Sequence, residues 1–134
     1  MFVIKRDGNR EPVQFDKITQ RISNLCNGLS SKVNPTLVTQ KVCSGLYDGV
    51  STMALDHLAA ETAAQLTMDH PDYAILAARI ELSNLHKLTS PFFTKTVQIL
   101  HKAGTLRNDY CTFIYEHAKR LDDAIDYDRD FDFD

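Results

Sequence analysis

The sequence predicts a mainly helical α+β fold, in which a β-hairpin or small three-stranded sheet caps a four-helix bundle and a helical extension follows. Two observations predict this fold. The first fifteen residues alternate apolar and polar side chains on both sides of an Asp-Gly pair, which is the strongest short signal for a hairpin. After them, apolar residues recur at helical spacing in segments that begin with a capping residue or a proline.

The hairpin is expected to join strands at residues 2–6 and 11–15, but its register stays open. A four-residue loop would place Arg6 opposite Glu11, a favourable cross-strand pair, whereas a three-residue loop would place Lys5 opposite Glu11. Both registers leave one apolar and one polar face. With the four-residue loop, the apolar face contains Phe2, Ile4, Val13 and Phe15.

Two short helices are predicted next. The first has Asp16 as its N-cap and ends before Asn27-Gly28, because glycine suits the end of a helix. The second is capped by Asn34, with Pro35 in its first position. Its apolar stripe consists of Leu37, Val38, Val42 and Leu46.

A short third strand within residues 47–50 is predicted to lead into a long helix that starts at Ser51 or Thr52. The alanines of this helix permit close approach by its neighbours. A further helix follows His70-Pro71-Asp72 and is apolar on nearly all sides, so it should be central to the bundle. Beyond Ser90-Pro91, helical stretches are expected at residues 92–102 and 108–125. The apolar line of the long helix consists of Leu55, Leu58, Thr62 and Leu66.

The composition is typical of a globular protein rather than a disordered one. The chain has 134 residues, of which 43% are hydrophobic and 25% charged. No apolar run approaches the ~20 residues of a membrane span, and the N-terminus does not resemble a signal peptide. The widely spaced Cys26, Cys43 and Cys111 favour reduced thiols in the cytoplasm over a disulfide scaffold or a zinc site. Cys26 and Cys43 are expected to fill the core.

The formal net charge of −3 is unevenly distributed. From residue 122 onward, seven aspartates and one arginine give −6, so the residues before them sum to +3. Since the basic residues form no long stripe, nucleic acid is not expected as a partner. The tail lacks the Gly and Glu placement of a calcium loop, and we interpret it as a solvated or truncated segment. Its aspartates are Asp122, Asp123, Asp126, Asp128, Asp130, Asp132 and Asp134.

Basic side chains gather where the hairpin meets the first helix. Lys5 and Arg6 approach the turn, and Lys17 lies in the first helical turn, where the helix dipole favours an anion rather than a cation. A negatively charged ligand explains Lys17 better than solvent exposure does, although an exposed lysine is the ordinary alternative. Thr52 and Asp56 share a helix face one turn apart, which is also compatible with helix capping.

No catalytic motif accompanies these residues. The sequence contains no GxxxxGK[ST], no GxSxG and no HExxH. From the residues alone, the chain is therefore a helical domain with a basic hairpin and an anion site as a hypothesis.

Four segments resemble a known family. VIKRDGNREPVQFDKI is similar to the signature of the ATP-cone, the regulatory nucleotide-binding domain of ribonucleotide reductase large subunits. LYDGVSTMALDHLAAETAA and HPDYAILAARIELSNLHK resemble the class I, eukaryotic-type enzyme, which reduces ribonucleoside diphosphates. AIDYDRDFDFD resembles the stretch before that enzyme's catalytic barrel. The resemblance implies an ATP-cone at residues 1–90 and a helical extension at 91–134.

The resemblance further implies a site for ATP or dATP, accompanied by Mg²⁺ on the phosphates and without metal ligands from side chains. Phosphates would contact Lys5, Arg6, Lys17 and Lys87. Thr52 and Asp56 would lie near the ribose or phosphates, and Glu11 and Gln14 would frame the adenine together with the backbone from residue 12 to 18. The full implied set is Lys5, Arg6, Glu11, Pro12, Val13, Gln14, Phe15, Asp16, Lys17, Ile18, Thr52, Asp56 and Lys87.

The implied partners are other large subunits and the radical-bearing small subunit of the full enzyme. Catalytic residues would lie beyond residue 134, so this segment is expected to be non-catalytic by itself, whether it is an excised fragment or a naturally short protein. Two alternatives stay open: a stand-alone ATP-cone regulator, and a helical interaction module that binds no nucleotide. Paired cysteines ahead of the cone, which would favour the first alternative, are absent from the sequence.

Overall fold

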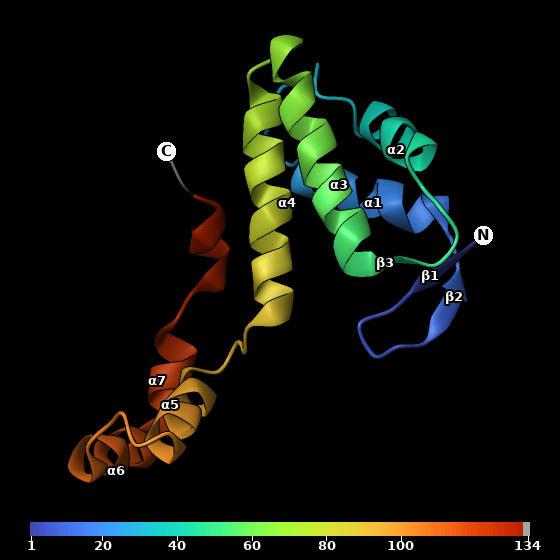
Figure 1. Cartoon of the computed structure of the whole chain (residues 1–134). Coiled ribbons are helices and arrows are strands. Elements are labelled where there is room, and N and C mark those ends of the chain that lie inside the picture. The colour runs from blue at the N-terminus through green and yellow to red at the C-terminus, as the bar shows by residue number, and fades with distance from the viewer. Residues whose placement is uncertain (133–134) are drawn as a thin grey trace. The chain divides into compact units, whose positions relative to one another are not determined.

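The computed structural model describes residues 1–132. It confirms the predicted mainly helical α+β fold with a small three-stranded sheet (Figure 1). The chain forms two compact units, Met1–Asn84 and a second that starts at Leu85. Helix α4, Asp72–Leu88, runs from the first unit into the second. The functional division at residue 90 stays a prediction.

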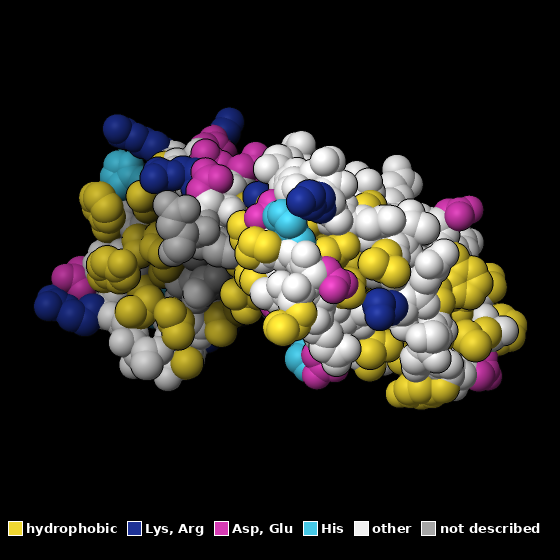
Figure 2. All heavy atoms as spheres, turned by 90° about the horizontal axis from the view of Figure 1, so that it is seen from above, with side chains coloured by type: hydrophobic (Ala, Val, Ile, Leu, Met, Phe, Trp, Pro, Cys, Tyr) yellow, Lys and Arg dark blue, Asp and Glu magenta, His cyan; other side chains and the backbone are white. Residues whose placement is uncertain are grey.

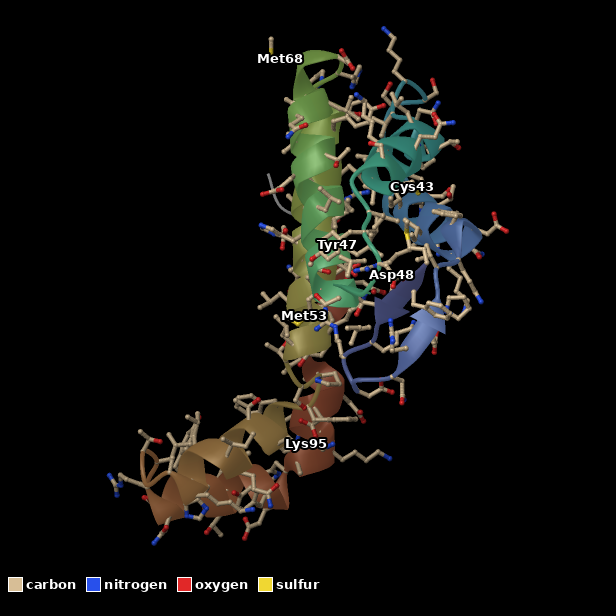
Figure 3. All side chains as sticks on the ribbon, turned by 45° about the vertical axis from the view of Figure 1, so that its right-hand side comes forward. Cys43, Tyr47, Asp48, Met53, Met68 and Lys95 are labelled. Carbon is tan, nitrogen blue, oxygen red and sulfur yellow. The ribbon has the colours of Figure 1, made fainter. Side chains whose placement is uncertain are left out.

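The sheet of the first unit has the strand order β2-β1-β3. Strand β1 (Phe2–Ile4) pairs antiparallel with β2 (Arg10–Pro12) and parallel with β3 (Val50–Ser51). The predicted short third strand therefore exists, but it lies at Val50–Ser51 and shares only Val50 with the expected range 47–50. Asp48, labelled in Figure 3, connects the segment before β3 to β1, because its Oδ1 accepts a hydrogen bond of 2.6 Å from the Phe2 amide.

Both predicted hairpin registers are wrong. Ile4 lies opposite Arg10, and the Lys5 amide donates to the Asn9 carbonyl at 2.8 Å. The loop is tightened by Gly8, which adopts φ +85° and donates its amide to the Lys5 carbonyl at 2.9 Å. Such a left-handed position after a tight turn is typical of three-residue hairpin loops and suits glycine.

The expected apolar face of the hairpin is also wrong. Val3 is the buried residue of β1, with 6% of its surface exposed, while Phe2 and Ile4 are exposed at 45% and 37%. Because side chains alternate along a strand, burying Val3 turns its two neighbours toward solvent. Phe15 is not in a strand but begins the first helix.

Local sequence determines two of the helix starts. The predicted cap at Asn34 is confirmed, and of the two starts left open for the long helix, Ser51 is the cap and Thr52 the first helical residue. The Asn34 side chain accepts hydrogen bonds from the amides of Thr36 and Leu37, and Ser51 Oγ accepts one from Ala54. Asp16, by contrast, is not an N-cap, because Gln14 occupies that position without a side-chain cap hydrogen bond. The helices of this unit besides α4 are α1 (Phe15–Leu25), α2 (Pro35–Ser44), α3 (Thr52–Gln65) and the 3-10 turn η1 (Leu66–Met68).

One core joins the four helices of the first unit, and α3 lies beside α4 (Figure 1). As predicted, the alanines of α3 permit this approach: Ala59, Ala60 and Ala63 are all buried. Arg79 on α4 also holds the end of α1, because its Nη1 donates to the carbonyls of Leu25 at 2.9 Å and Asn27 at 2.7 Å. The core contains Ile22, Val33, Val38, Val42, Leu55, Ala59, Ala60, Ala63, Leu66, Tyr73, Leu76 and Ile80.

The second unit packs its helices around Val97, Cys111 and Ile114. The predicted helix over residues 108–125 is interrupted at His117, whose φ of −111° and ψ of 19° are not helical. The elements after α4 are α5 (Phe93–Lys102), α6 (Asn108–Glu116), α7 (Ala118–Ala124) and the 3-10 turn η2 (Tyr127–Phe131).

The interpretation of the acidic tail as merely solvated is wrong for two of its aspartates. Asp122 accepts hydrogen bonds from Thr94, at 3.0 Å from the amide and 2.7 Å from the hydroxyl. Asp130 Oδ2 lies 2.8 Å from His86 Nε2. Asp134 lies outside the described residues. These carboxylates therefore organise the helices of the second unit.

The three cysteines are free thiols. Cys26 packs against the main core, as predicted, and burial raises its pKa although Arg79 opposes the shift. Burial also raises the pKa of Cys43, which is partly exposed. Within the described part of the chain, no helix combines the length and hydropathy that a membrane crossing requires.

Candidate functional site

The hairpin loop directs its basic side chains to different partners. Lys5 Nζ lies 3.3 Å from Glu11 Oε2 in an exposed ion pair. Arg6 reaches α3, where its Nη2 lies 3.7 Å from Asp56 Oδ2. Arg10 instead pairs with Asp48 at 3.7 Å, so its side chain connects parts of the sheet and does not reach Asp56.

Asp56 is the centre of a charged group that also contains Arg6 and Arg21, which we call the Asp56 group. Its side chain is only 8% exposed, and its Oδ1 accepts a hydrogen bond from Arg21 Nη1 while its Oδ2 faces Arg6. Desolvating a carboxylate costs several kcal/mol, and attraction to nearby cations offsets this cost, so the two arginines explain why an aspartate is tolerated at this buried position of α3. The structure thus brings together Arg6 and Asp56, which are fifty residues apart in the sequence.

Arg21 is a member of this group that the sequence analysis missed. Besides Asp56, its guanidinium donates to Ser83 Oγ at 3.2 Å and Asn84 Oδ1 at 3.0 Å, both on α4. Burial, and after it the neighbouring Arg6, lowers the pKa of Arg21. One signal was available: Arg21 immediately precedes the apolar-stripe residue Ile22, which places it at the edge of the buried face of α1.

Two helices begin beside this group. Lys17 lies in the first turn of α1, one turn before Arg21, and Thr52 begins α3 one turn before Asp56. Residues four apart share a helix face, so both side chains lie on the same side as the Arg21–Asp56 pair. Lys17 is exposed, and the described residues provide no ion pair for it. The orphan amides of α1 receive no bond from the Gln14 side chain.

The remaining predicted site residues occupy three settings. Pro12 ends β2, and Val13 continues the hairpin with a 3.1 Å hydrogen bond from its amide to the Met1 carbonyl. In α1, Phe15 and Asp16 are exposed, whereas Ile18 packs against the core. Lys87 lies in the last turn of α4, within the second unit, and its predicted contact with phosphate stays a prediction.

A second polar group lies at the exposed surface of α3 and α4. His57 Nδ1 is 2.8 Å from Glu81 Oε1, and His57 Nε2 is 3.5 Å from Glu61. The hydrogen bond and charge of Glu81, followed by the charge of Glu61, raise the pKa of His57 above its ordinary value of 6.5. Glu81 also accepts a bond of 3.4 Å from Asn84, which connects this group to Arg21.

We expect His57 to stabilise the fold more in acid than in base. Since its folded-state pKa lies above the unfolded value, its stabilising contribution is complete below the unfolded pKa and disappears as the pH rises through the folded pKa. NMR titration of the ring protons should give a pKa above 6.5 for His57, and the variant His57→Gln should lose this part of the pH dependence of unfolding. A measured pKa at or below the ordinary value would contradict the assigned role of Glu81.

The described residues also bear on whether the chain has a metal site of its own. No group of three or more His, Cys, Asp or Glu side chains within residues 1–132 is arranged to hold a metal ion. On the face shown in Figure 2, lysine and arginine side chains are scattered among acidic and apolar ones. The group around Asp56 contains two arginines, with Lys17 one turn away on α1, so its positive charges outnumber the one carboxylate and suit an anion.

A comparison with protein families matches the ATP cone domain to residues 1–88. The chain belongs to the ATP-cone domain family. The match extends from the hairpin to the last residue of α4, so the cone includes every element that contributes to the Asp56 group. The resemblance inferred from the sequence is thereby confirmed.

Curated relatives that are all named as large chains or large subunits of ribonucleoside-diphosphate reductase match nearly the whole chain. The cone and its extension are 53% identical over 143 residues to the ribonucleoside-diphosphate reductase large chain of Schizosaccharomyces pombe, covering 99% of this chain and 18% of the relative. The large subunit of Arabidopsis thaliana is 51% identical, with 100% and 18% covered. Large chain 2 of Saccharomyces cerevisiae is 48% identical, with 99% and 16% covered. The chain thus spans less than a fifth of the length of these relatives.

Proposed function

We propose that this ATP cone is the nucleotide-sensing regulatory domain of a class I ribonucleoside-diphosphate reductase large subunit. It binds ATP or dATP as an effector, not as a substrate, and performs no catalysis by itself. The observation that carries the proposal is the meeting of Arg6 and Arg21 with Asp56, one turn along α1 from the exposed Lys17, in a chain of the ATP-cone family.

The electrostatics support a polyphosphate ligand. Lys5 and Arg6 on the hairpin loop and Lys17 on α1 supply positive charge from two segments, and the lysines act as point-charge partners of phosphate. The free amides at the beginning of α1 add the positive end of a helix dipole. Mg²⁺ would be carried by the phosphates themselves, because these side chains are mostly cations.

The base would lie against the hairpin and the first turn of α1. Glu11 accepts hydrogen bonds and would receive the adenine amino group, which guanine does not present at that position. Its exposed ion pair with Lys5 at 3.3 Å costs little to rearrange, since such pairs contribute about 0–1 kcal/mol. Gln14 and the backbone from residue 12 to 18 would form the rest of the frame.

Regulation requires the site to distinguish two effectors that differ by one 2′-hydroxyl. One hydrogen bond contributes about 1–3 kcal/mol, which shifts a two-state equilibrium by roughly 5- to 150-fold. We propose that ATP permits activity, whereas dATP promotes an inhibited oligomer of large subunits that excludes radical transfer from the small subunit. The complete enzyme would act in the cytoplasm.

The variant Asp56→Asn tests the site and its discrimination together. We expect this variant to bind ATP but to lose most of the difference between ATP and dATP, because an amide lacks the charge that orders Arg6 and Arg21. Titration calorimetry with ATP, dATP and GTP measures affinity, and light scattering with each nucleotide measures the oligomer.

The outcomes separate the alternatives. Wild-type protein that binds ATP and dATP but not GTP supports the proposal, whereas protein that binds none of them is better described as an interaction module. If Asp56→Asn leaves both affinities and the oligomer distribution unchanged, Asp56 has no part in discrimination. The matched control is Asp48→Asn, which alters a carboxylate bound to the sheet but not to the Asp56 group.

A further inference from the structure

Arg21 and Arg6 contact the same carboxylate in unequal ways. Arg21 Nη1 donates a hydrogen bond to Asp56 Oδ1, whereas Arg6 Nη2 stays 3.7 Å from Asp56 Oδ2, beyond hydrogen-bond distance. The hydrogen-bonded contact comes from Arg21 on α1, and the longer contact comes from Arg6 on the hairpin loop.

The two arginines also differ in how firmly they are held. Arg21 is anchored to a third helix through Ser83 at 3.2 Å and Asn84 at 3.0 Å, and Asn84 is itself buried. Arg6 is carried by the exposed turn that Gly8 closes, and Asp56 is its one ion-pair partner among residues 1–132. Arg21 is thus part of the helix bundle, and Arg6 is the side chain that can change partner.

We propose that Arg21 is a positioning residue of the nucleotide site. By holding Asp56 and offsetting its charge from within the bundle, Arg21 keeps Asp56 from binding Arg6 tightly and leaves the Arg6 guanidinium for a phosphate group. When a phosphate binds Arg6, the Arg21–Asp56 hydrogen bond keeps the buried carboxylate paired. The change of partner therefore leaves no buried charge unpaired. This inference rests on the function proposed above.

The test is a pair of charge-conserving substitutions, Arg21→Lys and Arg79→Lys. A single ammonium group cannot reproduce the divided bonds of Arg21 to Asp56 and to α4, so we expect Arg21→Lys to lower the affinity for ATP and for inorganic tripolyphosphate by about three- to tenfold. Arg79→Lys is the matched control, because Arg79 also connects α1 and α4 but donates to the carbonyls of Leu25 and Asn27. It should leave both affinities unchanged.

Adding Asp56→Asn to Arg21→Lys separates positioning from a general structural role. Once the carboxylate is neutral, Arg6 is released without the help of Arg21, so the double variant should recover ATP affinity to within about twofold of wild type. A merely structural loss would not be recovered in this way. Circular dichroism at the calorimetry temperature verifies that each variant is folded, and Arg21→Gln replaces Arg21→Lys if the lysine variant does not fold.

Two results would overturn the inference while sparing the proposed function: ATP affinity unaltered in Arg21→Lys, or a loss that Asp56→Asn does not relieve. Wild-type protein that binds neither ATP nor tripolyphosphate would overturn the proposed function, and the inference with it.

Discussion

Replacing Lys5 and Lys17 together by glutamine should weaken ATP binding by about 30- to 150-fold. Each lysine is expected to contribute a contact with a charged phosphate of about 1–1.5 kcal/mol, and the two contacts come from separate segments. Lys5 loses only an exposed ion pair with Glu11, and Lys17 has no partner within the described chain, so the fold should be preserved. Titration calorimetry at two salt concentrations measures the loss and the accompanying decrease in salt dependence.

The control is a double variant with the same change of charge, Lys32→Gln with Lys41→Gln. These exposed lysines lie before and at the end of α2 and belong to none of the predicted phosphate contacts. ATP affinity should be retained in this variant. If the two double variants lose ATP affinity by the same factor, the positive charge acts only through the net charge of the domain, and the predicted phosphate contacts are wrong.

Replacing Leu76 by alanine should lower the free energy of unfolding by about 2–5 kcal/mol. Leu76 is fully buried in α4, in the core shared by the four helices, so its truncation leaves a cavity as well as removing apolar contact. Urea unfolding followed by circular dichroism gives the difference directly.

Ile75 provides the matched control on the same helix. It is 38% exposed, so Ile75→Ala should cost clearly less than Leu76→Ala. Equal costs for the two variants would show that the side of α4 assigned to the core is incorrect. The Leu76 result bears on the nucleotide site as well, because α4 supplies Ser83 and Asn84, which anchor Arg21.

Local interactions explain which features could be predicted. The caps at Asn34 and Ser51 depend on a side chain and the amides two or three residues later, so the residues themselves are sufficient evidence. The buried alanines of α3 follow from helical spacing in the same way. Lys5, Arg6 and Lys17 were recognised as a group because they occupy one short segment.

The errors concern choices that distant contacts decide. The hairpin register depends on the left-handed turn at Gly8, and tertiary packing decides which of the two alternating faces is buried, which is the face of Val3. Asp16 is a good capping residue, yet the chain enters α1 two residues earlier, so Gln14 occupies the cap. In each case the local sequence permits more than one conformation, and tertiary contacts determine which one forms.

By itself, the sequence determined the class of fold, most helix boundaries, the family and the basic character of the hairpin, because these depend on short-range periodicity and on matching segments. Only the tertiary structure decided that Arg21 joins Asp56 and α4, and that Arg6 reaches the same carboxylate from the hairpin. The physical reason is that a buried charge is stable only where partners from other segments converge on it, and that convergence is a property of packing rather than of neighbouring residues.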